Sequence, residues 1–408
     1  MTVSRLLSCA LLVAAGAVQA DPPEVVVLNE RGIAHLLAVR PAEAVLAFEQ
    51  ARAALPEHRI LKRNLAAALA ALAEERRRAS RPLDAIDLLK EAVDLHPERL
   101  RYRVLLGRAR FEGGRDVDRL LAGEDFEWVL ARDPDHLDAL VNLGQIRYLD
   151  RELADAAEHW RSALKLRPSD TDVRARLAKA ERERKVEEAY ESLTAASFRV
   201  RYAPAIPAEK AAAVLRLCEE AYGDLTKRFQ TYPGLIVVTL YPPAEFRSAT
   251  RMYGWVAGLS DGTIRITVAP GTSNTSLRAT IYHELTHHLI RSLAPRVPVW
   301  LHEGLAQIAE GKSVPHALGR LRRLDAPEVA ELSAQVVRLR DPREVSRFYD
   351  LAVSFTHYLL ELQGYPGFLG VLRALREGRS ELEALRTVYG SPRAELFRRW
   401  LETRLRAR

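Results

Sequence analysis

The stretch LVNLGQIRYLDRELADAAEHWRSALKLRP, residues 140–168, decides the fold of the first part of the chain. It carries large, small and helix-breaking residues at the offsets that two packed helices need. Gly144 and Ala156 are small enough to let two helices approach closely, and Trp160 fills the space beside them. Pro168 ends the second helix, because proline has no backbone N–H to donate. The stretch therefore predicts a pair of packed helices.

The same series of residues recurs upstream at a period near 34 residues. One earlier unit repeats it with Gly32, Phe48 and Pro56. Between the two units, the prolines that end successive second helices lie 41, 37 and 34 residues apart, so the spacing is looser than the period. We expect the extra residues in helix joints around residues 74–81 and 113–116, where charge and glycine replace the apolar period.

The region from about residue 24 to 170 resembles tetratricopeptide repeats, about four of them. A helix over residues 171–193 would cap the array. The resemblance implies an all-α solenoid whose concave face docks a protein partner. We therefore predict a tetratricopeptide-repeat domain over residues 21–193.

The first twenty residues have the three parts of a secretory signal peptide. Arg5 is positively charged, residues 6–18 are apolar, and residues 18–20 form a small-residue cleavage site. We expect residues 1–20 to be removed, and the protein to be exported into a bacterial periplasm or out of the cell. A lipoprotein signal ending at Cys9 is an alternative, but it would leave almost no apolar run. After removal Cys218 is the single cysteine, which excludes an intrachain disulfide.

The composition of the 408 residues, 48% hydrophobic and 28% charged, provides for two domains with apolar cores. It excludes disordered, collagen-like and disulfide-rich proteins. The formal net charge of +7 is small for this length and is scattered among acids, which argues against a nucleic-acid partner. The N-terminal apolar run is too short to span a bilayer, and no other stretch predicts a transmembrane segment.

A second domain is predicted over residues 194–408. From residue 197 the apolar period changes from helical to alternating, which places the domain boundary near residues 194–197. Strands are expected around residues 198–202, 235–241 and 263–268, with a helix over 207–230 and a helical region from 342 to the end.

The motif HELTH at residues 283–287 lies in a helix that we expect to be capped by Ser273 or Asn274. Residues four apart on a helix project from the same face, so His283 and His287 can bind one metal ion. Zinc is the ion that two histidines and a carboxylate suit best.

The third ligand is predicted in WLHEGLAQ, residues 300–307, which follows a proline-containing turn. Glu303 is favoured over Glu310, because Gly304 beside it would let the backbone approach the metal helix. The metzincin alternative needs a histidine six residues after the second histidine of the motif, and Leu293 occupies that position.

HELTH followed by WLHEGLAQ resembles the gluzincin metallopeptidases, the thermolysin-like branch of the zincins. The resemblance is strongest to the peptidase-MA-like domains that bacteria fuse to tetratricopeptide arrays. It implies an α+β zincin-like domain with Zn²⁺ held by His283, His287 and Glu303, water in the fourth position, and Glu284 as the general base. Hydrolysis of a peptide bond requires the same groups: a metal that polarises the scissile carbonyl, and a carboxylate that takes the proton of the attacking water.

Three further positions are compared with the family pattern. Thermolysin-like enzymes orient a zinc histidine with a carboxylate at the position of Gln307, so the amide predicts weaker tuning of the metal. Tyr349 resembles the residue that stabilises the oxyanion and ranks above Tyr358 and His357, although a core tyrosine fits the pattern equally well. The strand at residues 263–268 resembles the edge strand along which zincins bind an extended peptide.

We therefore predict an exported zinc metallopeptidase, a hydrolase of peptide bonds, whose peptide or protein substrates or partners dock on the repeats. The alternative is a peptidase-like protein with weak or no catalysis that acts as a tetratricopeptide binding adaptor in envelope assembly. The presence of Glu284 argues against simple loss of catalysis.

Overall fold

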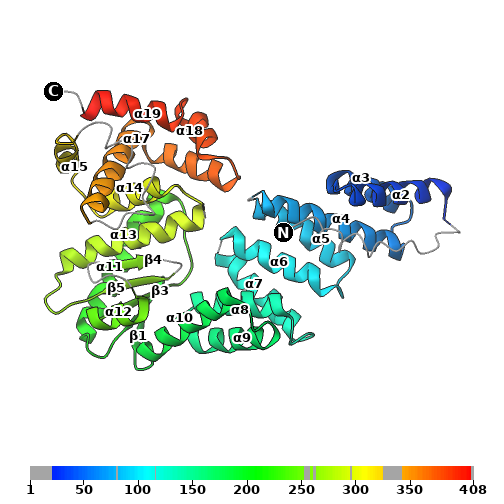
Figure 1. Ribbon diagram of the computed structural model, residues 1–408, viewed down its shortest axis with the longest axis horizontal. Helices are drawn as coiled ribbons and strands as arrows, with labels where there is room; N and C mark the ends of the chain where they lie inside the picture. The colour runs from blue at the N-terminus through cyan, green and yellow to red at the C-terminus, as the bar shows by residue number, and fades with distance from the viewer. Residues whose placement is uncertain are drawn as a thin grey trace. The chain divides into compact units, whose positions relative to one another are not determined.

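Figure 1 shows a computed structural model of the protein, which describes residues 21–79, 81–114, 116–251, 258–260, 263–294, 296–324 and 342–405. The described residues are mostly helical and include a small sheet of five strands. The chain divides into two compact units, unit 1 ending at Leu143 and unit 2 beginning at Gly144. The signal peptide predicted for residues 1–20 lies outside the described residues.

Unit 1 consists of helices that pack in successive pairs, as expected for helical repeats. Several of them begin with a proline, which is favourable there because the first N–H groups of a helix have no partner within it. The pairs are α2 (Pro23–Leu37) with α3 (Pro41–Ala54), α4 (Arg59–Arg78) with α5 (Pro82–Leu95), and α6 (Leu100–Gly113) with α7 (Asp116–Leu130); α8 (Leu137–Leu149) spans the division between the units.

Glycine–aromatic contacts hold the two helices of a repeat close together. A Cβ atom added at Gly32 would lie 2.5 Å from the ring of Phe48. In unit 2, a Cβ at Gly144 would lie 2.6 Å from the indole nitrogen of Trp160. Real Cβ atoms do not approach other atoms this closely, so both positions require glycine. These contacts confirm the close helix approach that the repeat pattern predicts.

The two predicted joints differ. The first joint is shorter than the predicted range 74–81, because α4 continues to Arg78 and α5 begins at Pro82. Arg77 stabilises the extended helix through ion pairs of 2.7 Å with both Glu74 and Glu112, the latter on α6. At the second joint Gly114 has a φ of 73° and ends α6, in agreement with the prediction.

Unit 2 combines the end of α8 with further helices and the sheet. Its elements are α9 (Leu153–Leu166), α10 (Thr171–Glu187), β1 (Glu191–Thr194), β2 (Phe198–Tyr202), α11 (Ala208–Phe229), β3 (Ile236–Tyr241), α12 (Pro243–Thr250), β4 (Gly258–Ser260), β5 (Ile264–Thr267), α13 (Asn274–Leu293), α14 (Val299–Ala309), α15 (Val314–Leu321), α17 (Pro342–Arg376), α18 (Glu381–Tyr389), α19 (Arg393–Trp400) and a π-helical turn (Leu401–Leu405).

The strand order is β1-β2-β3-β5-β4, with β2, β3 and β5 parallel and the outer strands β1 and β4 antiparallel to their neighbours. The prediction that residues 263–268 form an edge strand is wrong, because β5 pairs with β3 on one side and with β4 on the other. The predicted capping helix over residues 171–193 is too long, because α10 ends at Glu187 and residues 191–194 pair with β2.

The two faces of the sheet differ in polarity, because successive side chains of a strand point to opposite sides. The apolar face contributes Val200, Leu240 and Ile266 to the core that includes residues of α11 and α13. These two helices lie next to the sheet (Figure 1). The opposite face carries Arg265 and Tyr241, and α12 packs against β3 and β5. Helices therefore cover both faces of the sheet: one face through apolar contacts, and the other beside polar and charged side chains.

A buried ionic cluster joins α10 to the polar face of the sheet. The carboxylate of Glu183 is fully buried and accepts hydrogen bonds of 2.7 Å from Arg151 and 2.9 Å from Tyr148. Arg265 of β5 is also fully buried and donates to the Tyr148 hydroxyl at 2.7 Å. Because α10 is bound to the sheet in this way, it lies in unit 2, and the division between the units differs from the boundary predicted near residues 194–197.

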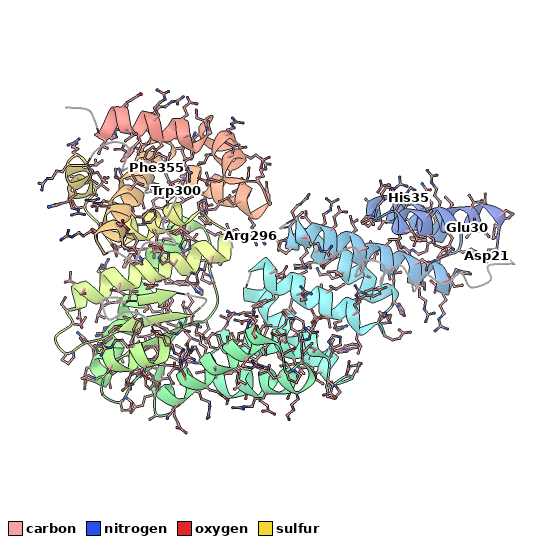
Figure 2. All side chains as sticks on the ribbon, in the orientation of Figure 1. Asp21, Glu30, His35, Arg296, Trp300 and Phe355 are labelled. Carbon is pink, nitrogen blue, oxygen red and sulfur yellow. The ribbon has the colours of Figure 1, made fainter. Side chains whose placement is uncertain are left out.

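The C-terminal helices pack around the short helix α14. Trp300 of α14 and Phe355 of α17 have ring centroids 5.1 Å apart, and both are labelled in Figure 2. The indole N–H of Trp300 donates to Glu381 of α18 at 3.1 Å. Gly364, with a φ of 62°, interrupts α17. Across the described residues, the helices are all too short or too polar to cross a membrane.

Candidate metal centre

Helix α13 places the two histidines of the HELTH motif. Ser273 caps the helix by accepting a hydrogen bond of 3.1 Å from the backbone N–H of Ser276, which decides between the two predicted caps. The residues of its apolar stripe, including Leu285 and Leu289, lie in the core of unit 2. The core therefore fixes the rotation of α13 about its axis, and with it the direction of the histidines.

The predicted metal ligands lie together. The Nε2 atoms of His283 and His287 are 3.0 Å apart, and the Glu303 carboxylate lies 3.7 Å from the first and 3.5 Å from the second. Ligands at about 2.0–2.1 Å from a tetrahedral zinc ion are separated by roughly 3.3 Å. The three groups thus fit Zn²⁺ in both spacing and chemical type, two imidazoles and one carboxylate.

Helix α14 holds Glu303 beside the histidines, but not for the reason that the sequence suggested. A Cβ at Gly304 would lie 2.5 Å from the carbonyl oxygen of Ala352 and 2.1 Å from the Thr356 hydroxyl, both on α17. Gly304 therefore permits a close approach of α14 to α17, and the predicted approach to the metal helix is wrong. This contact sets the position from which Glu303 reaches the histidines.

Glu310 contacts the other side of the first histidine. Its Oε2 lies 3.1 Å from Nδ1 of His283, the ring nitrogen that faces away from His287. The 3.1 Å contact does not meet hydrogen-bond geometry here, because Nδ1 of His283 has no hydrogen-bond partner among the described residues. A small rotation of either side chain would let Nδ1 donate to Glu310, and this would leave Nε2 free to bind a metal. From the sequence Glu310 is expected only as an alternative ligand, although its spacing of seven residues from Glu303 predicts the same side of a helix.

Gln307 does not take the orienting role. It is buried, and neither atom of its amide has a hydrogen-bond partner among the described residues. The carboxylate nearest to Nδ1 of His283 is that of Glu310, three residues further along the chain.

Glu284 lies beside the histidines without joining the three ligand groups. It is 5% exposed, and its Oε2 has no hydrogen-bond partner in the part of the chain that the structure describes. Burial raises its pKa to about 7, with His283 opposing this shift and the negative charge of Glu303 adding to it. A buried carboxyl with this pKa can both accept and return a proton near neutral pH.

The histidines around the site have different electrostatic environments. Burial lowers the pKa of His287, although the hydrogen bond and charge of Glu303 oppose the change. His302 stacks on His287 with ring centroids 4.3 Å apart, and burial together with the charge of His287 lowers its pKa to about 3. For His283, burial acts to lower the pKa, but the nearby carboxylates, Glu310 first, have the larger combined effect. The pKa of His283 is therefore raised above its ordinary value. His302 is therefore a neutral ring that packs against a ligand.

Tyr349 of α17 is influenced by the acidic groups of the site. Burial raises the pKa of its hydroxyl, and the negative charges of Glu303, Glu284 and Glu310 raise it further. The other candidates lie elsewhere: Tyr358 stacks with Phe355 in the core, and His357 lies 3.8 Å from Glu361. Among the three candidates, Tyr349 is the one whose pKa responds to the acidic groups of the site.

Comparisons with known proteins bear on the helical repeats. A family model described as tetratricopeptide repeat matches residues 70–118 and 121–171. The solved structure titled "Crystal structure of MamA protein" is similar to 38% of this chain and 80% of its own, with 18% identity and a TM-score of 0.32. No curated protein matches the chain.

The family match and the helix pairs agree over the same part of the sequence. The glycine–aromatic contact of Gly144 with Trp160 lies within the second matched segment. Tetratricopeptide repeats indicate protein partners, since a solenoid of helix pairs presents an extended binding surface. The chain therefore carries tetratricopeptide repeats and is indicated to bind protein.

Proposed function

We propose that unit 2 contains a gluzincin-like domain of zincin fold that binds Zn²⁺ and hydrolyses peptide bonds, and that the repeats dock its substrate or a protein partner. The observation that carries the proposal is the convergence of His283, His287 and Glu303, whose ligand atoms lie within 4.8 Å of one another. The signal-like residues 1–20 support a bacterial protein that acts outside the cytoplasm.

The residues around the ligands have complementary roles in this reaction. Zn²⁺ held there would polarise the scissile carbonyl and lower the pKa of the attacking water. Glu284 takes the proton of that water and passes it to the leaving amine. Tyr349 donates a hydrogen bond to the developing oxyanion. Among the described strands β4 is the last of the sheet, so an extended peptide would pair its backbone with β4, the role that the sequence suggested for residues 263–268.

The metal site is tested by the zinc content of the purified chain. We expect about one zinc per chain, as for a site of two histidines and a glutamate. Replacing both His283 and His287 with Ala should remove it, while His288→Ala on the same helix should not. Metal analysis after dialysis measures this. Zinc retained by the double variant would place the metal elsewhere in the chain.

The contact of Glu310 with His283 predicts a second effect on the metal. Glu310→Gln replaces the charged acceptor at Nδ1 with a neutral amide, so zinc affinity should fall by about tenfold or more. Gln307→Met, which removes a buried amide without a partner, should leave the affinity unchanged within about twofold. Competition with a chromogenic chelator measures both. A larger loss in the Gln307 variant would return the orienting role to that residue.

A second candidate function is that of a binding adaptor with weak or no catalysis, acting in envelope assembly. The match of residues 70–118 and 121–171 to tetratricopeptide repeats favours it, and the comparisons support this function better than the peptidase. An adaptor needs the repeats and does not need the proton transfer at Glu284. A variant that retains the metal but lacks the general base Glu284 therefore distinguishes the two functions.

A further inference from the structure

A groove in unit 1 crosses the first helices of consecutive repeats. It has a volume of about 650 Å³ and is lined by residues of α4, α6 and the start of α8. Its floor includes Ala67 and Ala71 of α4 and Leu105 of α6. Residues four apart on a helix share a face, so one face of α4 lies along the groove. The small side chains leave room for an extended chain to lie between the helices.

The walls of this groove are rich in arginine. Five arginines and three carboxylates line it, together with two histidines. One of the carboxylates, Glu74, is already paired with Arg77, which lies outside the lining, at 2.7 Å. The groove therefore has an excess of positive charge.

Most of the lining arginines lack a carboxylate partner. Within the described ranges, no ion pair and no side-chain hydrogen bond is formed by Arg63, Arg99, Arg101 or Arg108, although all four are partly buried. Arg101 and Arg108 lie seven residues apart on α6, so they project from the same side of the helix. Partly buried guanidinium groups without partners are suited to bind carboxylates, often in a bidentate manner.

The electrostatics of neighbouring groups agree with this charge. Partial burial lowers the pKa of His96, and the charge of Arg63 lowers it further. Arg108 contributes, after Arg77, to lowering the pKa of Glu74, although burial acts in the other direction. The positive charge of the groove thus disfavours protonation of the groups that line it and favours the binding of an anion.

We propose that this groove binds an extended acidic segment of a partner protein, whose carboxylates pair with the four arginines while its small or apolar side chains lie on the alanine floor. This deepens the docking role proposed for the repeats and does not depend on the metal. A peptide is favoured over a nucleic acid, because the small and apolar side chains of the floor can pack against the side chains of a peptide, whereas the bases of a single-stranded nucleic acid are usually bound by stacking on aromatic side chains.

The proposal is tested with the full-length mature chain and fluorescent dodecapeptides of alternating Glu and Ala, Gln and Ala, or Lys and Ala. Fluorescence anisotropy should show binding of the Glu peptide, at least about tenfold tighter than the Gln peptide and weakened by salt, and no binding of the Lys peptide. An oligodeoxythymidylate of equal charge should bind more weakly than the Glu peptide. If it binds as tightly, the groove is a general anion site and the proposal is wrong.

Charge-reversal variants locate the binding. Arg101→Glu with Arg108→Glu should weaken binding of the Glu peptide by about tenfold or more. The matched control reverses Arg31 and Arg40, two exposed arginines of unit 1 outside the groove, and should change the affinity by less than twofold. Circular dichroism verifies that both variants are folded, and the milder Arg101→Gln with Arg108→Gln should show an intermediate loss.

Equal losses in the groove variant and its control would show that binding depends on net charge alone, which would overturn the proposal. The metal site provides an independent check. His283→Ala with His287→Ala should bind the Glu peptide as the wild type does, whether or not the chain is a peptidase. Failure of peptide binding therefore leaves the proposed hydrolysis open, and failure of hydrolysis leaves the groove open.

Discussion

Glu284→Gln is expected to leave about one zinc per chain and to reduce peptide hydrolysis by several orders of magnitude. The amide keeps the shape of the buried carboxyl but cannot accept the proton of the attacking water. Loss of a general base costs about 10²–10⁴ in rate, and the loss of its charge near the reacting atoms adds to this. Metal analysis and cleavage of an unstructured peptide, measured on the same preparation, test both parts of the expectation.

The matched control is Glu303→Gln, which changes the same functional group at a ligand position. Here zinc affinity should fall by about ten- to a hundredfold or more, and activity should be lost with the metal and partly return in excess zinc. A wild type that holds zinc but cleaves no peptide, together with a Glu284→Gln variant that still supports the protein's role in cells, would establish the adaptor function and contradict the peptidase.

The sequence was sufficient to predict which groups lie together at the candidate site, because helix periodicity places His283 and His287 on one face. The position of Glu303 near the histidines could also be predicted, because the prolines and glycines indicate a turn and a short helix that bring the chain back toward them. The position of Glu310 beside His283 and the packing of Gly304 against α17 were not predicted. Both depend on how helices that are distant in sequence approach each other, and a single sequence contains no direct signal for that distance.

The fold shows the same limit. The helix pairs and the strands β2, β3 and β5 follow from apolar periods that are long enough to recognise. The outer strands β1 and β4 are only four and three residues long, and in β1 the side chains are mostly exposed, so they have no clear alternation. The ionic cluster was also missed, because a charged residue is usually a solvated one and its partners are up to 117 residues away.

Glu183→Ala is expected to lower the free energy of unfolding of unit 2 by about 3–5 kcal/mol, the usual cost of removing one partner from a buried ion pair. Glu183 is fully buried between Arg151, at 2.7 Å, and Arg265, at 3.4 Å. Without it, Arg151 retains Glu187, and Arg265 loses its ion pair with Glu183. Urea denaturation of the full chain, followed by circular dichroism and by tryptophan fluorescence, measures the change.

The control lies on the same helix. Glu181 pairs with Arg161 at 2.7 Å, but both side chains are more than 40% exposed, so Glu181→Ala should cost at most about 1 kcal/mol. A second variant separates charge from packing: Glu183→Gln combined with Arg265→Met removes both charges and should recover part of the stability that Glu183→Ala loses. If Glu183→Ala and Glu181→Ala had equal small effects, the cluster would not hold α10 to the sheet. The inclusion of α10 in unit 2 would then need another physical cause.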